Sequence, residues 1–245
     1  MDLLPKLLSH PQPLTTGAAH LWLLDAGRFQ EKHLNQALDV MSIDEHERAQ
    51  KFVRGKHEYI ASRWLLRSAL SRYLQQPPHA LKFARHEKGK PYIPGQKIQF
   101  NLSHSGRWAV LTITSGAAVG VDVEEGKSSR DLTGIAANYY HTEEFLRLQE
   151  LQPEEQTLYF YQLWTLKEAL LKATGAGISA GLENLNFSIE PEISVEISPS
   201  LPAEFFANKW HFHQWQLPDA SLCALATSCA NKPAIHWFDA INIAG

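Results

Sequence analysis

Two spacings of apolar residues run through the first half of the chain. An apolar run at residues 21–24 predicts a strand over residues 20–25. Apolar residues then recur at helical spacing, which predicts a long helix over residues 44–75. Ser42 or Asp44 can cap its N-terminus, because short polar side chains accept the free backbone N–H groups there. Gly55 can interrupt this helix, because glycine is a poor helix former.

Two further apolar runs, at residues 97–102 and 108–114, predict strands on either side of a polar turn. Small residues at 115–118 then interrupt the pattern, as they do in connections between elements. We therefore expect a boundary here. Residues 1–117 are expected to form an N-terminal α+β half, and residues 118–245 a C-terminal α+β half.

The second half repeats the order of the first, with a strand, then helices, then strands. Alternation predicts a strand at residues 119–124, and a strong helical pattern covers 154–174 before Gly175, a common helix stop. Weaker helical patterns lie at 131–137 and 142–151. Short runs after the long helix predict strands at 185–189, 193–197, 209–217, 222–227 and 234–238. The predicted fold class is α+β, with two similar halves in one chain.

The composition is typical of a packed globular protein, with 44% hydrophobic and 20% charged residues. Two cysteines, Cys223 and Cys229, are too few for a disulfide framework, which favours a reducing compartment. Residues 1–10 lack the basic-then-apolar pattern of a secretion signal. No apolar run approaches the roughly 20 residues of a membrane span. We therefore expect a cytoplasmic protein.

The charge is unevenly distributed along the chain. Residues 46–90 contain eleven Lys or Arg and three Glu, a net charge of +8, so the remainder must carry −11 of the total of −3. A basic segment on an acidic protein suggests an anionic partner. The alternative, a solvated helix with long cationic side chains, remains equally open.

An acidic strand is the first candidate for chemistry. In the sequence VGVDVEE, Asp122 and Glu124 lie on the same face of the predicted strand, with Cα atoms about 7 Å apart. Two such carboxylates repel each other unless a cation lies between them, and hard oxygen ligands suit Mg²⁺. The motif alone leaves open an edge strand whose acidic face lies in water.

The long helix carries a second candidate, in the sequence WTLKEALLK. Glu168 and Lys172 are four residues apart and therefore neighbours on one face. Glu168 could be a third metal ligand or a base, and Lys172 could meet phosphate charge. The alternative is a surface ion pair worth about 0.3–0.5 kcal/mol.

Two polar loops offer phosphate-binding groups. The sequence FNLSHSG exposes Ser103 and His104 at a predicted turn that can hold a phosphate. The alternatives are a plain hairpin turn and a Ser–His hydrolytic pair, which we discount because no GxSxG elbow is present. In ARHEKGKPY, Arg85 and Lys90 flank a glycine, either as a phosphate-binding loop or as a basic turn. This loop is not a Walker A motif.

These motifs follow one another in the order ARHEKGKPY, FNLSHSG, VGVDVEE and WTLKEALLK. In this order, and at these spacings, they resemble the surfactin-type (Sfp-like) 4′-phosphopantetheinyl transferases. The resemblance spans about residues 44–186. It implies two similar α+β halves in a monomer, with coenzyme A and the active site between the halves.

The resemblance also implies a role for each motif. Asp122, Glu124 and Glu168 match the family's metal ligands, for Mg²⁺ with Mn²⁺ as a substitute, and Lys172 matches a lysine that contacts phosphates. Glu144 matches a further family acid. Coenzyme A contacts are implied for Arg48, Arg85, Lys90, Ser103 and His104.

The implied reaction transfers the 4′-phosphopantetheine arm of coenzyme A to a serine hydroxyl of an apo acyl or peptidyl carrier protein, which is usually acidic. Adenosine 3′,5′-bisphosphate is released. Lys172 and His104 would stabilise charge in the transition state. The base that takes the serine proton stays open between Glu168, Glu144 and a metal-bound water.

Two other function classes remain open. One is a carrier-protein-binding module of the same fold without chemistry, and the four residues Asp122, Glu124, Glu168 and Lys172 argue against it. The other is a nucleic-acid-binding protein that uses the basic segment, which lacks an interleaved aromatic motif. The expected partners are therefore coenzyme A and a carrier protein, without nucleic acid or membrane.

Overall fold

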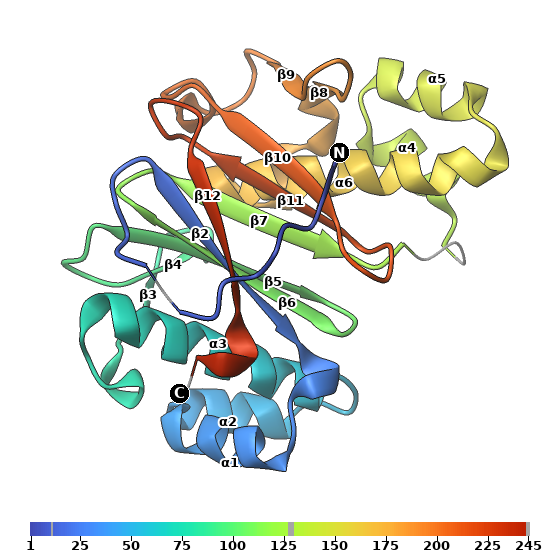
Figure 1. Ribbon diagram of the computed structural model, residues 1–245. Helices are drawn as coiled ribbons and strands as arrows, with labels where there is room; N and C mark the ends of the chain where they lie inside the picture. The colour runs from blue at the N-terminus through green and yellow to red at the C-terminus, as the bar shows by residue number, and fades with distance from the viewer. Residues whose placement is uncertain (11, 127–129, 244–245) are drawn as a thin grey trace.

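The computed structural model describes residues 1–10, 12–126 and 130–243, and its main elements stack in four layers (Figure 1). The helices are α1 (Glu31–Val40), α2 (Ile43–Gln50), α3 (Lys56–Leu74), α4 (Leu132–Tyr139), α5 (Thr142–Glu150) and α6 (Pro153–Thr174). The strands of the first half are β1 (Asp2–Leu3), β2 (Ala18–Asp25), β3 (Ala84–Arg85), β4 (Pro91–Tyr92), β5 (Ile98–Ser105) and β6 (Trp108–Ser115). Those of the second half are β7 (Val119–Glu124), β8 (Leu185–Ser188), β9 (Ser194–Ile197), β10 (His211–Gln216), β11 (Leu222–Thr227) and β12 (Ala234–Asp239).

Two four-stranded sheets form the inner layers. Their strand orders are β12-β2-β6-β5 and β1-β10-β11-β7. Helix α3 packs on the outer face of the first sheet and α6 on the outer face of the second, each over its own apolar core. A third core, which includes Leu21, Val110, Val121 and Leu225, lies where the inner faces of the sheets meet. The α+β class with two similar halves is confirmed.

The two ends of the chain exchange sheets. Strand β1 pairs in parallel with β10, and β12 pairs in parallel with β2. Each sheet therefore takes one edge strand from the other side of the predicted boundary at residue 117. The division into halves 1–117 and 118–245 remains a prediction, and the strand exchange ties the two halves together.

The helical stretch predicted over residues 44–75 is confirmed, and so is its interruption at Gly55. Gly55 adopts a left-handed conformation, with φ of +75°, and separates α2 from α3. An L-residue with a side chain rarely adopts this conformation. Ser42 is the N-cap of α2, where its hydroxyl accepts the Glu45 N–H in a capping box.

The predicted polar turn after residue 102 is corrected. Strand β5 continues through Ser103 and His104 to Ser105, and the turn begins only at Gly106. The polar residues keep the alternation of a strand, with Ser103 and Ser105 on the face toward β7, where their hydroxyls form hydrogen bonds. Polarity alone suggested a loop, but here it marks a strand whose neighbour supplies polar partners.

None of the described helices combines the length and the apolarity that a membrane crossing requires.

Candidate functional site

Close packing of α6 on β7 brings the two acidic motifs together. Gly120 has no side chain, and a Cβ there would lie only 2.1 Å from the Ala169 carbonyl oxygen and 2.4 Å from the Ala173 nitrogen. The valines of β7 face the core between the sheets, so Asp122 and Glu124 face the other way. Glycine at this position therefore lets the helix approach the carboxylates of the strand.

Lys172 of α6 contacts Asp122 of β7. Its ammonium lies 2.5 Å from Asp122 Oδ1 and 3.0 Å from Ser103 Oγ, and Ser103 also donates to Asp122 Oδ1 at 2.9 Å. Burial alone would lower the pKa of Lys172, but the Asp122, Glu168 and Glu124 carboxylates raise it above its usual value. The lysine is therefore held as a cation among three acids.

Glu168 and Asp122 are the two buried acids of this group. Only 8% of Glu168 and 3% of Asp122 is exposed, and Glu168 Oε1 and Asp122 Oδ2 are buried without a hydrogen-bond partner. Burial raises the pKa of Glu168 to about 7; Lys172 opposes this shift, while Asp122 and Glu124 add to it. Unpaired buried oxygens of this kind are costly, and they fit a site that receives a cation or a proton.

Glu124 completes the acidic face of β7. Burial, and then the Asp122 charge, raise its pKa, and Ser105 Oγ donates to Glu124 Oε2 at 2.8 Å. Within the described residues, no three His, Cys, Asp or Glu side chains are arranged so that they could hold a metal ion as they stand. The three acids are close enough for the charges of Asp122 and Glu124 to raise the pKa of Glu168. Their use as one set of metal ligands remains a prediction.

A cavity of about 220 Å³ opens beside Glu168. Its walls come from the β3–β4 loop, from β5 and from the C-terminal end of α6, so that both halves contribute. Its lining includes Lys88, Lys90, Asn101, Glu168, Lys172 and Gly175. The lysines of this lining favour an anionic ligand that binds beside the buried acid.

Lys90 joins the two halves at the edge of this cavity. Its ammonium donates to the Val119 carbonyl at 3.1 Å and to the Ala173 carbonyl, near the end of α6, at 2.6 Å. Burial lowers the pKa of Lys90 to about 8. Lys90 therefore lies at the site, as expected, but in this structure its hydrogen bonds go to backbone carbonyls.

Three arginines, Arg48, Arg63 and Arg85, lie close enough for their charges to affect one another. The guanidinium carbons of Arg48 and Arg63 lie 5.8 Å and 5.5 Å from the centre of the Tyr59 ring. Burial and the charges of Arg48 and Arg85 lower the pKa of Arg63, although nearby acidic groups oppose this shift. Arg63 Nε is buried without a partner. Partial burial, then Arg63 and Lys172, lower the pKa of His104. The charges of Arg63 and Lys172 therefore both act on His104.

Arg85 uses one of its donors within its own loop. Its Nη1 donates to the Gly89 carbonyl at 2.9 Å, within the β3–β4 hairpin that the basic motif itself forms. Gly89 has φ of +89°, which favours glycine. The motif that suggested a phosphate loop is therefore a tight hairpin with cationic side chains.

Two family models match the chain, one in each half. Residues 118–226 match the model of the 4′-phosphopantetheinyl transferase superfamily, and residues 28–115 match that of 4′-phosphopantetheinyl transferase, N-terminal. The chain is 32% identical over 222 residues to 4′-phosphopantetheinyl transferase HetI of Nostoc sp. (strain PCC 7120 / SAG 25.82 / UTEX 2576), which covers 88% of this chain and 90% of HetI. The chain belongs to this superfamily. It is also 33% identical over 184 residues to 4′-phosphopantetheinyl transferase Sfp of Bacillus subtilis (strain 168), covering 71% of this chain and 81% of Sfp.

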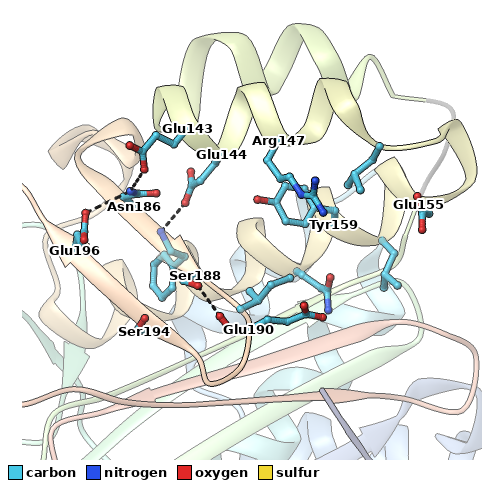
Figure 2. Close-up of a pocket in the computed structure, with 15 residues that line it drawn as sticks. Glu143, Glu144, Arg147, Glu155, Tyr159, Asn186, Ser188, Glu190, Ser194 and Glu196 are labelled. Carbon is cyan, nitrogen blue, oxygen red and sulfur yellow. Dashed lines mark hydrogen bonds between the residues drawn. The ribbon is translucent and has the colours of Figure 1, made fainter.

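Glu144 of this phosphopantetheinyl transferase lies in a different place. It faces a groove of about 610 Å³ between α5, α6 and the β8–β9 hairpin (Figure 2). Its carboxylate accepts the Phe187 N–H at 2.7 Å and the His141 N–H at 3.0 Å, and lies 2.7 Å from the Lys167 ammonium. Glu144 and Glu168 line separate cavities, and the contacts of Glu144 are those of a residue that ties α5, α6 and β8 together.

Sequence reasoning missed three polar residues of this transferase. Asn101 lines the cavity, and Ser105 contacts Glu124. Besides burial, the charge of Arg63 lowers the pKa of His104. One signal was available for the first two. Asn101 and Ser105 alternate with Ser103 along one face of β5, as residues of a single polar strand face must.

Proposed function

We propose that this enzyme, which transfers the phosphopantetheine of coenzyme A to carrier proteins, holds one Mg²⁺, replaceable by Mn²⁺, with Asp122, Glu124 and Glu168. The observation that carries the proposal is the pair of buried, unpartnered oxygens, Asp122 Oδ2 and Glu168 Oε1. Carboxylate oxygens are the ligands that Mg²⁺ prefers. When bound, the cation would neutralise charge on the pyrophosphate of coenzyme A.

Coenzyme A is proposed to enter the cavity beside Lys172. Lys172 contacts Asp122, and its charge acts on His104, so we propose that both side chains contact the pyrophosphate. Ser103 and Lys90 border the same place. Charge-assisted bonds to phosphate are short and strong, which supports a cluster of cations here.

The arginine group gives coenzyme A a second anchor. Besides burial, the charges of Arg48 and Arg85 both lower the pKa of Arg63. These arginines are proposed to bind phosphate groups of coenzyme A that lie away from the reacting centre. The other basic residues of α2 and α3 would meet the acidic carrier protein.

The chemical step follows from these positions. The carrier's serine Oγ attacks the β-phosphorus of coenzyme A, and the bond to the bridging oxygen breaks, so that adenosine 3′,5′-bisphosphate leaves. Glu168 is proposed to take the serine proton, because it lines the cavity. Glu144 is not a candidate base in this proposal, since Lys167 and two backbone N–H groups already occupy its oxygens. Lys172 balances the charge that develops on the phosphate oxygens.

The cavity is lined by both halves of this one chain, and we propose a monomer as the working unit. Cys223 and Cys229 are both free and buried, in keeping with the proposed cytoplasmic setting.

The direct test is mass spectrometry of an apo carrier protein incubated with this enzyme, coenzyme A and Mg²⁺. We expect a gain of one phosphopantetheine arm on the carrier's serine. EDTA should abolish the gain and added Mg²⁺ or Mn²⁺ should restore it. Full activity in the chelator would remove the cation from the proposal, and no gain under any condition would contradict the activity itself.

A further inference from the structure

Strands β5 and β7 are the adjoining edges of the two sheets, and side chains close the seam between them. Asn101 Oδ1 accepts the Val121 N–H at 2.9 Å, Ser103 Oγ accepts the Val123 N–H at 3.4 Å, and Ser105 Oγ accepts the Glu125 N–H at 3.3 Å. Three alternate side chains of β5 thus replace the backbone carbonyls of a ladder. They satisfy edge N–H groups that would otherwise be left unpaired.

The two serines make a second bond that Asn101 does not make. Ser103 donates its hydroxyl to Asp122 at 2.9 Å, and Ser105 donates to Glu124 at 2.8 Å. Each serine therefore accepts a backbone N–H of β7 and donates to the carboxylate of the residue just before it. The seam thus sets the position of the backbone and the direction of the acid together.

Glu124 depends on this bond more than Asp122 does. Asp122 is also held by the Lys172 ammonium at 2.5 Å. Within the described part of the chain, the Glu124 carboxylate accepts a side-chain hydrogen bond from Ser105 alone. A glutamate has freely rotating bonds that must be fixed before its oxygen can serve as a ligand.

We propose that Ser105 is a positioning residue for the reaction: from the N-terminal sheet it aims the Glu124 carboxylate at the cation site. The inference rests on the proposed function, because it assumes that Glu124 is a ligand. Groups that hydrogen-bond to metal ligands typically contribute about 10–100-fold to metal affinity. Ser105 would then make metal binding depend on the contact between the two sheets.

The test is titration of Mn²⁺ into the full-length enzyme with saturating coenzyme A and no carrier protein, followed by electron paramagnetic resonance. Ser105→Ala is expected to weaken Mn²⁺ binding by about 10–100-fold. Ser105→Thr keeps the hydroxyl and should bind within a few-fold of wild type. If the alanine variant does not fold, Ser105→Cys keeps the volume with a weak donor and should show the same loss in part.

Ser228→Ala is the matched control. Ser228 Oγ accepts the Ala118 N–H at 2.9 Å, just before β7, so this variant loses the same kind of bond without touching a carboxylate. Its Mn²⁺ affinity should stay at the wild-type value. Unchanged Mn²⁺ affinity in Ser105→Ala, or an equal loss in Ser228→Ala, would overturn the inference. If the wild-type enzyme modified the carrier but bound no Mn²⁺, the cation site itself would fail instead.

Discussion

Helix α6 carries two lysines that each meet a buried carboxylate, and the two pairs differ in how completely they are satisfied. Lys167 lies 2.7 Å from Glu144, donates to the Leu182 carbonyl at 2.9 Å and also donates to the Leu185 carbonyl. Both partners are at most 1% exposed in their side chains. Lys172 and Asp122 lie 2.5 Å apart, but the lysine side chain is 28% exposed.

The acids of the second pair keep unused capacity. Asp122 Oδ2 and the neighbouring Glu168 Oε1 have no hydrogen-bond partner, whereas both Glu144 oxygens accept bonds. A buried polar group that is fully bonded supports the fold, and one that is left open is available to a ligand. Both lysines lie on α6; we call the Lys167–Glu144 pair the structural pair and the Lys172–Asp122 pair, which belongs to the proposed cation site, the functional pair.

Removing the structural pair's cation should have the largest effect on stability. Lys167→Ala leaves Glu144 as an uncompensated buried charge, which typically costs about 3–5 kcal/mol. Equilibrium unfolding in urea at pH 7 measures this loss. A loss of stability below about 1 kcal/mol would contradict the structural role, because that is the contribution of a solvent-exposed ion pair.

Removing the functional acid should act on turnover instead. Glu168→Gln is expected to lower kcat/KM by about 10³-fold, close to 4 kcal/mol, while circular dichroism stays unchanged. Glu155→Gln, on the exposed first turn of the same helix, serves as the control. Near-normal turnover in Glu168→Gln would remove Glu168 from the mechanism.

The cation of the functional pair should affect the use of coenzyme A. Lys172→Ala loses a charge-assisted contact to phosphate, which is worth about 1.5–3 kcal/mol, or roughly 10–100-fold in kcat/KM for coenzyme A. Steady-state kinetics with coenzyme A as the varied substrate measure the effect. An unchanged kcat/KM would mean that Lys172 only balances Asp122.

The open acid should also make metal-free protein sensitive to pH. Folding raises the pKa of Glu168 from 4.5 to about 7, so the native state binds more protons between these values. The free energy of unfolding should therefore fall as pH rises through this window. Glu168→Gln lacks this penalty and should be more stable than wild type by about 3 kcal/mol at pH 8 in EDTA.

Urea unfolding at pH 5 and pH 8 makes this comparison, and the advantage of the variant should shrink at the lower pH. A variant that is less stable than wild type at pH 8 would show that the Glu168 carboxylate stabilises the empty site.

Much of the secondary structure could be predicted from the sequence, because the residue spacings that specify it lie within single strands and helices. The alternation of Asp122 with the valines, and the four-residue spacing of Glu168 and Lys172, specify faces of single elements. The approach of these two faces depends on Gly120, whose significance appears only when α6 lies against β7.

Other features depend on distant partners and were not predicted. The sheet exchange of β1 and β12 joins residues from opposite ends of the chain, which no local pattern encodes. Glu144 and Glu168 are both acids on helices, and only the three-dimensional contacts of Lys167 separate their roles. In the sequence, Arg63 is one of many basic residues. Only the structure shows that it packs on Tyr59 together with Arg48.

We propose that the acids Asp122 and Glu124 of β7 and Glu168 of α6 share one cation, and that the groove near Glu144 does not bind it. Anomalous diffraction at the manganese edge, from crystals grown with Mn²⁺ and coenzyme A, tests this claim most directly. We predict one strong peak within bonding distance of Asp122, Glu124 and Glu168. Bound coenzyme A with no peak among these three side chains, or with the peak beside Glu144, would contradict the account.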